Sequence, residues 1–296
     1  MFDTIKFNQV PKYVEFQYWF ERIGDDVWRV INKETSEQVC KYTWPGTPET
    51  AVDGISNKDE LDPVTITNIV ADFMKFRLRP EYTVGRKVSV ADMDAETAVT
   101  VYETLITGIA FIRSKASGVD PDTIWNKVDT GILTWLRNGD MYTAPASTQY
   151  HESFTGGLLY HTLKVYNAII DLTTLPQFQT VSVESAALIA LVHDWCKIGL
   201  YESYNRNVKN DVTGKWEQVE AFRTNQKGVP LGPGVSSMFL ASKCFRLSTD
   251  EALAIRWHMG AWRVAESEYN EFQLANETVP HVHLIQFADQ LSIVKY

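Results

Sequence analysis

The sequence contains only three cysteines among its 296 residues, and no C-x-x-C pair. Cys40, Cys196 and Cys244 are odd in number and far apart, so neither a disulfide framework nor a thiolate zinc site is indicated. No apolar run approaches the roughly 18 residues that a membrane helix needs. The start, MFDTIKFNQV, has no basic stretch followed by an apolar block. We therefore expect a soluble cytoplasmic protein with no membrane partner.

The sequence also lacks an excess of positive charge. It has 28 Lys and Arg against 37 Asp and Glu, and its formal net charge is -9. Because clustered Lys and Arg drive the binding of duplex nucleic acid, this composition excludes a duplex as the main partner. A small phosphate-containing substrate held in a local positive pocket stays open. The oligomeric state is left open as well.

Histidine is absent from the first 150 residues. All six histidines lie between His151 and His283. Imidazole is the most common metal ligand and a frequent proton carrier near neutral pH. The two halves of the chain therefore carry different chemistry, and the second half is the place to look for a site.

The first half is predicted to begin with a small β meander and to continue with helices. Period-2 alternation and intervening turns indicate three strands, at residues 13–22, 27–31 and 38–44. Residues 45–63 contain few apolar side chains and read as a linker. Helices are expected at 94–115 and, from an Asp120-Pro121 start, at 120–138. The predicted organisation is a meander with its linker over 1–60, a helical region over 61–140 and a second domain over 141–296.

Four further helices are predicted in the second domain, and each carries a metal-capable side chain that its periodicity turns inward. These side chains are His161 in the first helix, His193 and Asp194 in the second, His258 in the third and Asp289 in the fourth. The second helix is predicted to run from a Ser182 N-cap to Gly199, which puts His193 and Asp194 in its last turns.

Two imidazoles and two carboxylates form a mixed nitrogen and oxygen ligand set for a divalent ion. The set is His161, His193, Asp194 and Asp289, and it does not distinguish Mn, Mg, Fe, Co, Ni and Zn. A divalent ion with open positions activates water and neutralises phosphate oxygens, which suits phosphate ester hydrolysis. Lys197 is expected to add a fixed positive charge for the substrate phosphate. The alternative for His193 and Asp194 is a structural hydrogen-bonded pair at a helix end.

Four segments of the second half carry a family resemblance through their order. They are GGLLYHTLKV, LVHDWCKIG, WHMG and FADQLS. Together they resemble the HD-domain metal-dependent phosphohydrolase superfamily, whose ordered signature is a His, a His-Asp pair and a distal Asp. The resemblance covers about residues 142–296. It is closest to a branch that includes HD-type 3′-to-5′ exoribonucleases and many phage and bacterial HD proteins.

The resemblance implies a site and a fold. It makes His161, His193, Asp194 and Asp289 metal ligands, and Lys197 the lysine of the usual H-D-x-G-K. It also implies a mainly α fold, an HD-domain helical bundle preceded by the small N-terminal antiparallel β meander.

The chain departs from the family pattern at two positions. Cys196 replaces the usual glycine of H-D-x-G-K, and a nucleophilic role for this thiol is not indicated because no base is specified for it. Pro233 stands in PLGPGVSSMFLA where members of the branch often have a His. Proline cannot ligate a metal, so a second ion loses one ligand, although His258 keeps the other candidate position. A mononuclear site is therefore expected.

Further side chains are candidates for the substrate and for proton transfer. His151, ten residues before His161, and His258 are expected to assist proton transfer; a polar loop residue and a helix-end residue are the respective alternatives. A predicted hairpin between residues 201 and 223 is a candidate phosphate-gripping lid, with an ordinary charged hairpin as the equal alternative. Its basic residues are Arg206, Lys209, Lys215 and Arg223.

The sequence thus predicts an enzyme of the phosphoric ester hydrolase class. The expected reaction is hydrolysis of a nucleotide phosphate ester or phosphodiester by metal-activated water. One alternative is a 3′-to-5′ exonuclease on single strands, which the net charge disfavours. The other is a catalytically degenerate HD module that binds a nucleotide or a protein partner.

Overall fold

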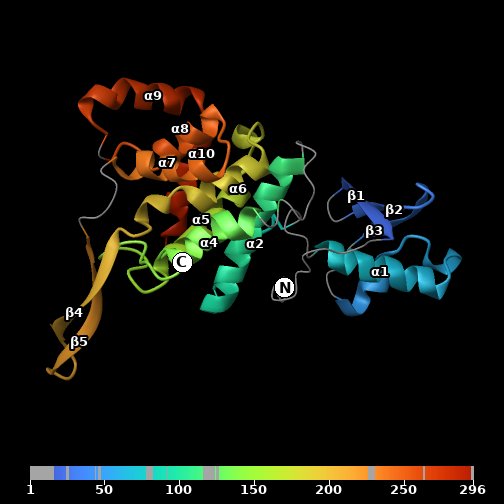
Figure 1. The fold of residues 1–296 in the computed structure, drawn as a ribbon, viewed down its shortest axis with the longest axis horizontal. Helices are drawn as coiled ribbons and strands as arrows, with labels where there is room; N and C mark the ends of the chain where they lie inside the picture. Colours follow the sequence, from blue (N-terminus) through green and yellow to red (C-terminus); the bar gives the residue numbers. More distant parts are fainter. Residues whose placement is uncertain are drawn as a thin grey trace. The chain divides into compact units, whose positions relative to one another are not determined.

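The computed structural model describes residues 17–24, 27–43, 45, 48–77, 83–91, 93–115, 124, 127–225, 231–262 and 264–294. These residues form a mainly helical protein with one three-stranded and one two-stranded antiparallel sheet (Figure 1). The predicted class, mainly α with a small β element, is confirmed. The chain divides into two compact units, Met1–Thr83 and Val84–Tyr296.

The first unit is the predicted meander packed against one helix. Its strands pair in the order β1-β2-β3 and are followed by a helix. Their bounds are Tyr18–Gly24 for β1, Val27–Asn32 for β2, Gln38–Thr43 for β3 and Pro63–Arg77 for the helix α1. The Phe73 ring of α1 lies 5.2 Å from Phe20, 4.8 Å from Trp28 and 4.3 Å from Tyr42, measured between ring centroids. One face of the sheet is therefore buried, as the alternation predicted; residues 13–16 lie outside the described residues.

The predicted linker at 45–63 is instead partly helical and packed. Two 3-10 helices, η2 (Pro48–Gly54) and η3 (Lys58–Glu60), occupy much of it. The Tyr42 hydroxyl donates a hydrogen bond to the Ala51 carbonyl at 2.8 Å, and Ala51 and Ile55 are buried. A few apolar side chains at the correct spacing suffice to attach such a segment to a sheet. The linker prediction, which relied on the prolines, did not take them into account.

The second unit is built from helices, and two of its long connections carry short turns of 3-10 helix. The helices are α2 Ala95–Lys115, η5 Val128–Leu133, α4 Thr134–Asn138, α5 Gly157–Leu172, α6 Val183–Val192, α7 Pro233–Cys244, α8 Thr249–Arg256, α9 Tyr269–Thr278 and α10 Pro280–Ser292. The short turns are η6 Pro176–Phe178 and η8 Glu266–Glu268. The start of α2, the Ser182 cap of α6 and the Ser248-Glu251 capping box of α8 agree with the sequence.

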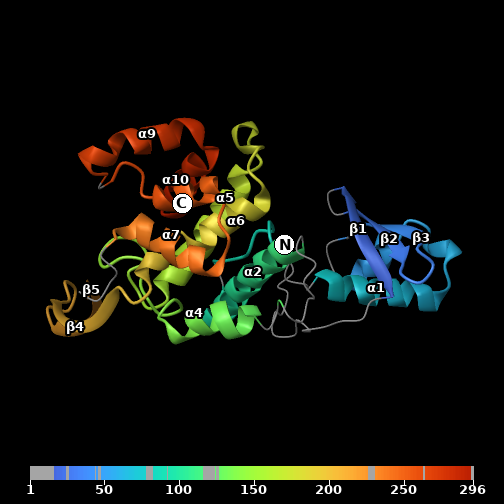
Figure 2. The same cartoon turned by 45° about the horizontal axis from the view of Figure 1, so that its top comes forward.

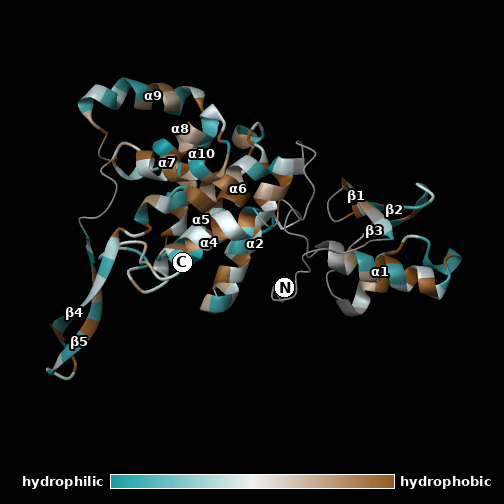
Figure 3. Cartoon of the chain, viewed as in Figure 1, coloured by the Kyte–Doolittle hydropathy of each residue, from teal (hydrophilic) through white to brown (hydrophobic). Residues whose placement is uncertain are grey.

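Helix α6 is the core of the second unit. Every residue from Ser185 to Val192 is buried, as expected for a helix that is apolar on all sides. It contacts α2, α5, α8 and α10, and in Figure 3 it is largely brown, the colour of apolar residues. A side chain at its end is therefore held by a fully packed element.

By length and composition alone, one helix among the described residues could cross a membrane. This is the segment Ala95–Ser114 of α2. Half of it is buried, in contact with α5 and α6, and the core helix of a soluble protein satisfies the same criterion. Cytoplasmic localisation stays a prediction.

The predicted helix at 120–138 differs from the observed structure in its winding. Asp120 and Pro121 lie outside the described residues. From Val128 to Leu133 the chain is π-helical, and ordinary α-helix resumes at Thr134. The Thr134 hydroxyl donates to the carbonyl of Asp129, five residues earlier, at 2.7 Å, which supports the wider turn.

Helix α6 also ends earlier than predicted, at Val192 rather than at Gly199. The Leu191 carbonyl accepts a hydrogen bond from the Tyr102 hydroxyl of α2 at 2.8 Å, and the indole of Trp195 donates to the same hydroxyl at 2.7 Å. The Tyr102 side chain thus satisfies the Leu191 carbonyl, which a longer helix would have paired with a backbone N–H. The chain turns at Asp194 into a 3-10 helix, η7 (Trp195–Lys197).

The predicted hairpin is confirmed. Strands β4 (Tyr201–Lys209) and β5 (Trp216–Thr224) pair antiparallel along their full length. Figures 1 and 2 both show them projecting away from the helices. Most of their side chains are exposed, and Phe222 near the base is the one buried residue of the two strands.

Candidate metal centre

The first candidate ligand is held by the start of α5. His161 lies in the second turn and is 1% exposed. Gly156 precedes the helix with a φ of 88°, in the left-handed region that favours glycine. A Cβ on Gly157 would lie 1.9 Å from the Glu152 carbonyl oxygen. The two glycines therefore let the preceding loop fold onto the helix start, and this brings the ring of His151 to within 4.9 Å of the His161 ring, centroid to centroid.

The second and third candidate ligands follow the early end of α6. His193 is fully buried and caps the helix, and its Nδ1 lies 2.8 Å from the Ala190 carbonyl oxygen. Because a carbonyl only accepts, Nδ1 is the nitrogen that donates here, and Nε2 is the nitrogen that faces the cluster. Asp194 is 4% exposed at the turn into η7. Because the helix ends early, the side chains of His193 and Asp194 both lie at the cluster. The continuous helix predicted from the sequence did not include this arrangement.

His258 is held by a backbone carbonyl in the same way, at the end of α8. Its Nδ1 donates to the Ile255 carbonyl oxygen at 2.7 Å, which leaves Nε2 facing the cluster by the same argument. The Nε2 atoms of His193 and His258 are both buried without a hydrogen-bond partner. Buried polar atoms are nearly always paired, since an unpaired one costs about 1–3 kcal/mol. Two buried imidazole nitrogens without a hydrogen-bond partner, each beside a carboxylate, suit a cation.

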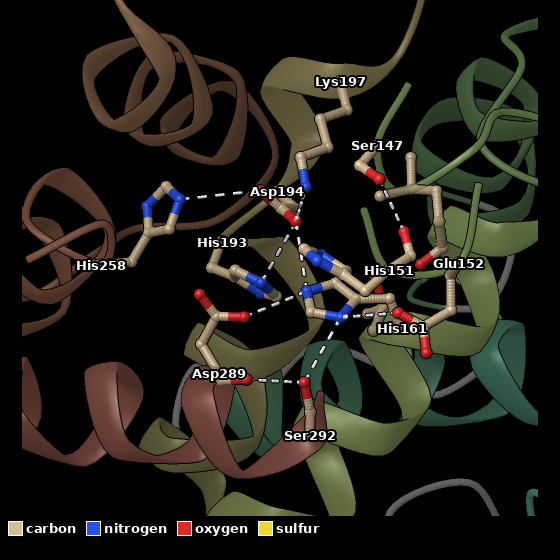
Figure 4. A network of polar contacts seen from close by, with 12 residues as sticks. Ser147, His151, Glu152, His161, His193, Asp194, Lys197, His258, Asp289 and Ser292 are labelled. Carbon is tan, nitrogen blue, oxygen red and sulfur yellow. Dashed lines mark hydrogen bonds and ion pairs between the residues drawn. The ribbon is translucent and has the colours of Figure 1, made fainter. Parts of the chain in front are cut away.

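The ligand atoms are spaced as one ion requires (Figure 4). The Nε2 of His161 lies 3.2 Å from Asp289 Oδ1 and 3.4 Å from Asp194 Oδ2, and His193 Nε2 lies 3.4 Å from the same Asp194 oxygen. Two ligands at about 2.1 Å from one ion and at angles of about 90–110° are about 3.0–3.4 Å apart. His161, His193 and Asp289 offer atoms within 4.8 Å of one another. Asp194 is not in that group and joins it through its contacts with the two histidines. The structure thus brings the four predicted residues together, and their donor atoms suit a divalent ion.

Electrostatics keep the two carboxylates anionic. Burial alone would raise the pKa of Asp194, but Lys197, His193 and His161 together hold it well below its usual range. Burial opposes ionisation of Asp289 too, and the nearby histidines outweigh it and lower the pKa to about 2. Both groups are charged at neutral pH, which suits a cation site.

Lys197 belongs to the same cluster. Its Nζ lies 2.7 Å from Asp194 Oδ2 in an ion pair that is mostly buried. Burial would lower the pKa of Lys197, yet Asp194 raises it above its ordinary value, so the ammonium is charged. The thiol of Cys196 differs: burial raises its pKa to about 12, which disfavours the thiolate and agrees with the absence of a nucleophilic role.

The two proton-transfer candidates lie at the edge of the cluster. His258 Nε2 is 3.6 Å from Asp194 Oδ1. The Nε2 of His151 is buried without a partner. Burial lowers the pKa of His151, and the nearby charges of His161 and Lys197 lower it further. Both candidates therefore stand close to the ligands, on opposite sides of Asp194 in Figure 4.

The predicted phosphate-gripping residues are not brought to the cluster. Arg206, Lys209, Lys215 and Arg223 are all exposed on the hairpin. Among the described contacts, Arg223 pairs with Glu202 of the neighbouring strand at 2.6 Å, and none of the four touches a candidate ligand. The hairpin carries four acidic side chains beside these four basic ones, so its field is locally balanced.

Two side chains near His161 were missed by the sequence analysis. Glu152 Oε2 lies 3.8 Å from His161 Nδ1, and Oε1 is held by Lys164 at 2.6 Å. The Ser292 hydroxyl donates to the Asp289 carbonyl and faces His161 Nδ1 at 3.4 Å. Both lie on the Nδ1 side of His161, where carboxylates and hydroxyls commonly support metal-binding histidines. Glu152 directly follows His151 and Ser292 ends the FADQLS segment, and these were the only sequence signals for them.

Pro233, where the resemblance expects a histidine, is the first residue of α7 and is exposed. It brings no ligand to the cluster. Comparisons of this chain with protein families, with curated proteins and with solved structures found no match.

Proposed function

We propose that the chain is a metal-dependent phosphohydrolase that cleaves a nucleotide phosphate ester or phosphodiester. The observation that supports it most is the convergence of His161, His193, Asp194 and Asp289 at ligand spacing, with the Nε2 of His193 buried and unpartnered among them. The resemblance to HD-domain phosphohydrolases names the same four residues independently of their geometry. A divalent ion, when bound, supplies charge neutralisation for phosphate oxygens and acidifies a coordinated water.

The chain's own residues perform distinct tasks in this proposal. The carbonyls of Ala190 and Ile255 hold His193 and His258 in one tautomer, with Nε2 directed to the cluster. The ammonium of Lys197, fixed beside Asp194, attracts a phosphate oxygen of the substrate. A half-buried histidine with a lowered pKa, such as His151, is neutral near pH 7 and can accept a proton.

The experiment that tests the proposal joins metal analysis to turnover. Protein purified without chelator is analysed for bound metal. Its hydrolysis of a panel of nucleotides, and of a phosphate ester that has no base, is then measured. About one ion per chain, lost in Asp194→Ala, with hydrolysis of at least one ester, is the expected result. No ion in the wild type would refute the four-ligand assignment. Bound metal without any turnover would instead favour the binding-module alternative.

A further inference from the structure

A small hollow lies between the start of α7 and the segment that follows α8. Its volume is about 100 Å³, and its walls include Leu231, Pro233, Trp257, Met259 and Trp262. A Cβ on Gly234 would lie 1.8 Å from the Arg256 carbonyl oxygen, so the backbones of the two helices touch there. This contact fixes the floor of the hollow.

The hollow adjoins the candidate metal centre through His258. Trp257 and Met259, which line it, are the two neighbours of His258 in the chain, and His258 Nε2 faces Asp194 at 3.6 Å. Pro233 lies in the opposite wall, and the resemblance expects a second metal ligand at that position. The chain thus has an apolar surface beside the centre where a further polar ligand was expected.

The walls favour a flat uncharged group over a phosphate. Trp262 is 68% exposed although it lines a concave surface, and Met259 and Leu231 are also exposed. The one cation of the walls, Arg256, is paired with Glu268 at 2.8 Å and stacks on the Trp257 ring at 4.5 Å. Its charge is already neutralised, whereas exposed indole and thioether surfaces suit stacking with an aromatic ring.

The size of the hollow limits how much of a ligand it holds. Pockets that enclose a whole drug-sized ligand measure about 300–1,000 Å³. A volume of about 100 Å³ accommodates no more than one base and leaves the remainder of the ligand outside. Trp257 and Met259 of the walls are the chain neighbours of His258, so a base in the hollow would lie on the segment that carries this residue of the centre.

We propose that this hollow is the subsite for the base of the substrate, with Trp262 as its stacking surface. The proposal rests on the phosphohydrolase function for the phosphate end of that substrate. The shared chemistry is a nucleobase joined to a phosphate, and it can come from a free nucleotide or from the end of a single strand. Stacking on an aromatic side chain tolerates any base. The subsite therefore discriminates strongly between a nucleotide and a phosphate ester without a base, and only weakly between one base and another.

The test measures binding of nucleosides, which contain no phosphate ester. Adenosine, guanosine, cytidine and uridine are titrated into wild-type protein, Trp262→Ala, Trp262→Phe and Trp216→Ala, with binding followed by ligand-observed NMR. Trp216 is a matched control because it is 71% exposed on the hairpin, away from the hollow. Expected are at least about tenfold weaker binding in Trp262→Ala, as loss of one stacked base implies, near-wild-type binding in Trp262→Phe and no change in Trp216→Ala.

Equal nucleoside binding by wild type and Trp262→Ala would overturn the subsite, as would an equal loss in Trp262→Ala and Trp216→Ala. A short single strand that binds more tightly than a mononucleotide, through Trp262, would assign the strand end; equal affinities would assign the free nucleotide. The readout is independent of turnover. Nucleoside binding through Trp262 in a protein that hydrolyses no ester would refute the hydrolase function and leave the subsite intact.

Discussion

The candidate metal centre and the β4–β5 hairpin both carry charged side chains, and they are built in opposite ways. In the centre, buried side chains from three separate segments converge on the partly exposed Asp289 of a fourth, and backbone carbonyls fix two of the imidazoles. In the hairpin, exposed charges of both signs alternate on two adjacent strands. Burial makes position and charge state costly to change, whereas exposed pairs exchange their partners for water at little cost. Substitutions should therefore have very different effects in the two regions.

The largest difference is expected for Asp194→Asn. This carboxylate faces His161, His193, His258 and Lys197, so its loss removes a ligand and leaves Lys197 without its partner. We expect loss of bound metal and at least a hundredfold fall in hydrolysis. Elemental analysis and turnover measure the two effects. The matched variant Glu202→Gln on the hairpin should retain both; equal effects from the two variants would remove the distinction.

A smaller effect on metal affinity is expected for Glu152→Gln. The Glu152 carboxylate faces the Nδ1 side of His161, whereas Asp194 and Asp289 face its Nε2. Residues of this kind change metal affinity by about 10–100-fold, and we expect the lower end because the distance is 3.8 Å. Competition with a chelator measures it. Glu220→Gln, which removes a hairpin carboxylate bonded to Thr155, should leave the affinity unchanged, and an unchanged affinity in Glu152→Gln would exclude the orienting role.

The same contrast applies to ion pairs that serve stability. Arg113 of α2 bonds Glu184 and the nearly buried Glu251. We expect Arg113→Ala to lower the free energy of unfolding by about 3 kcal/mol, and Arg223→Ala, from the exposed hairpin pair, by less than about 1 kcal/mol. Chemical denaturation measures both values. Similar losses in the two variants would contradict the dependence on burial.

The Arg113 network also predicts a pH dependence. Burial would raise the pKa of Glu251, but bonds from Arg113, Ser248 and Ser185 outweigh it and lower the pKa. A depressed folded-state pKa contributes stability above the unfolded pKa, and that contribution is lost as pH falls through the folded value. The difference in free energy of unfolding between wild type and Arg113→Ala should therefore be largest at neutral pH and should decrease in acid. A difference that increases on acidification would refute this assignment.

The smallest effect is expected from the hairpin's lysines. Lys209→Ala and Lys215→Ala change exposed charges, so we expect stability within about 0.5 kcal/mol of wild type. Because the hairpin's charges are balanced, KM for a nucleotide should change by less than about threefold, as for a weak exposed contact. Steady-state kinetics of the two variants measure this KM. A tenfold rise in KM would restore the predicted phosphate-gripping lid.

The sequence alone predicted the residues of the centre better than the path of the backbone. His161, His193, Asp194 and Asp289 were found because each follows an apolar pattern and matches an ordered motif. The early end of α6 could not be foreseen, since it depends on Tyr102, which bonds Trp195 from 93 positions away. The linker was misjudged because two buried side chains, Ala51 and Ile55, outweigh the prolines around them.

The unpartnered nitrogens of His193 and His258 have a consequence for the thermodynamics of the whole fold. A folded chain that leaves them bare carries a desolvation cost that an unfolded chain, open to water, does not carry. An ion that binds only the folded form removes this cost, and by mass action it stabilises the protein by about 2.7 kcal/mol at a hundredfold excess over the dissociation constant. On the proposed metal binding, the melting temperature should therefore rise with the concentration of free metal ion.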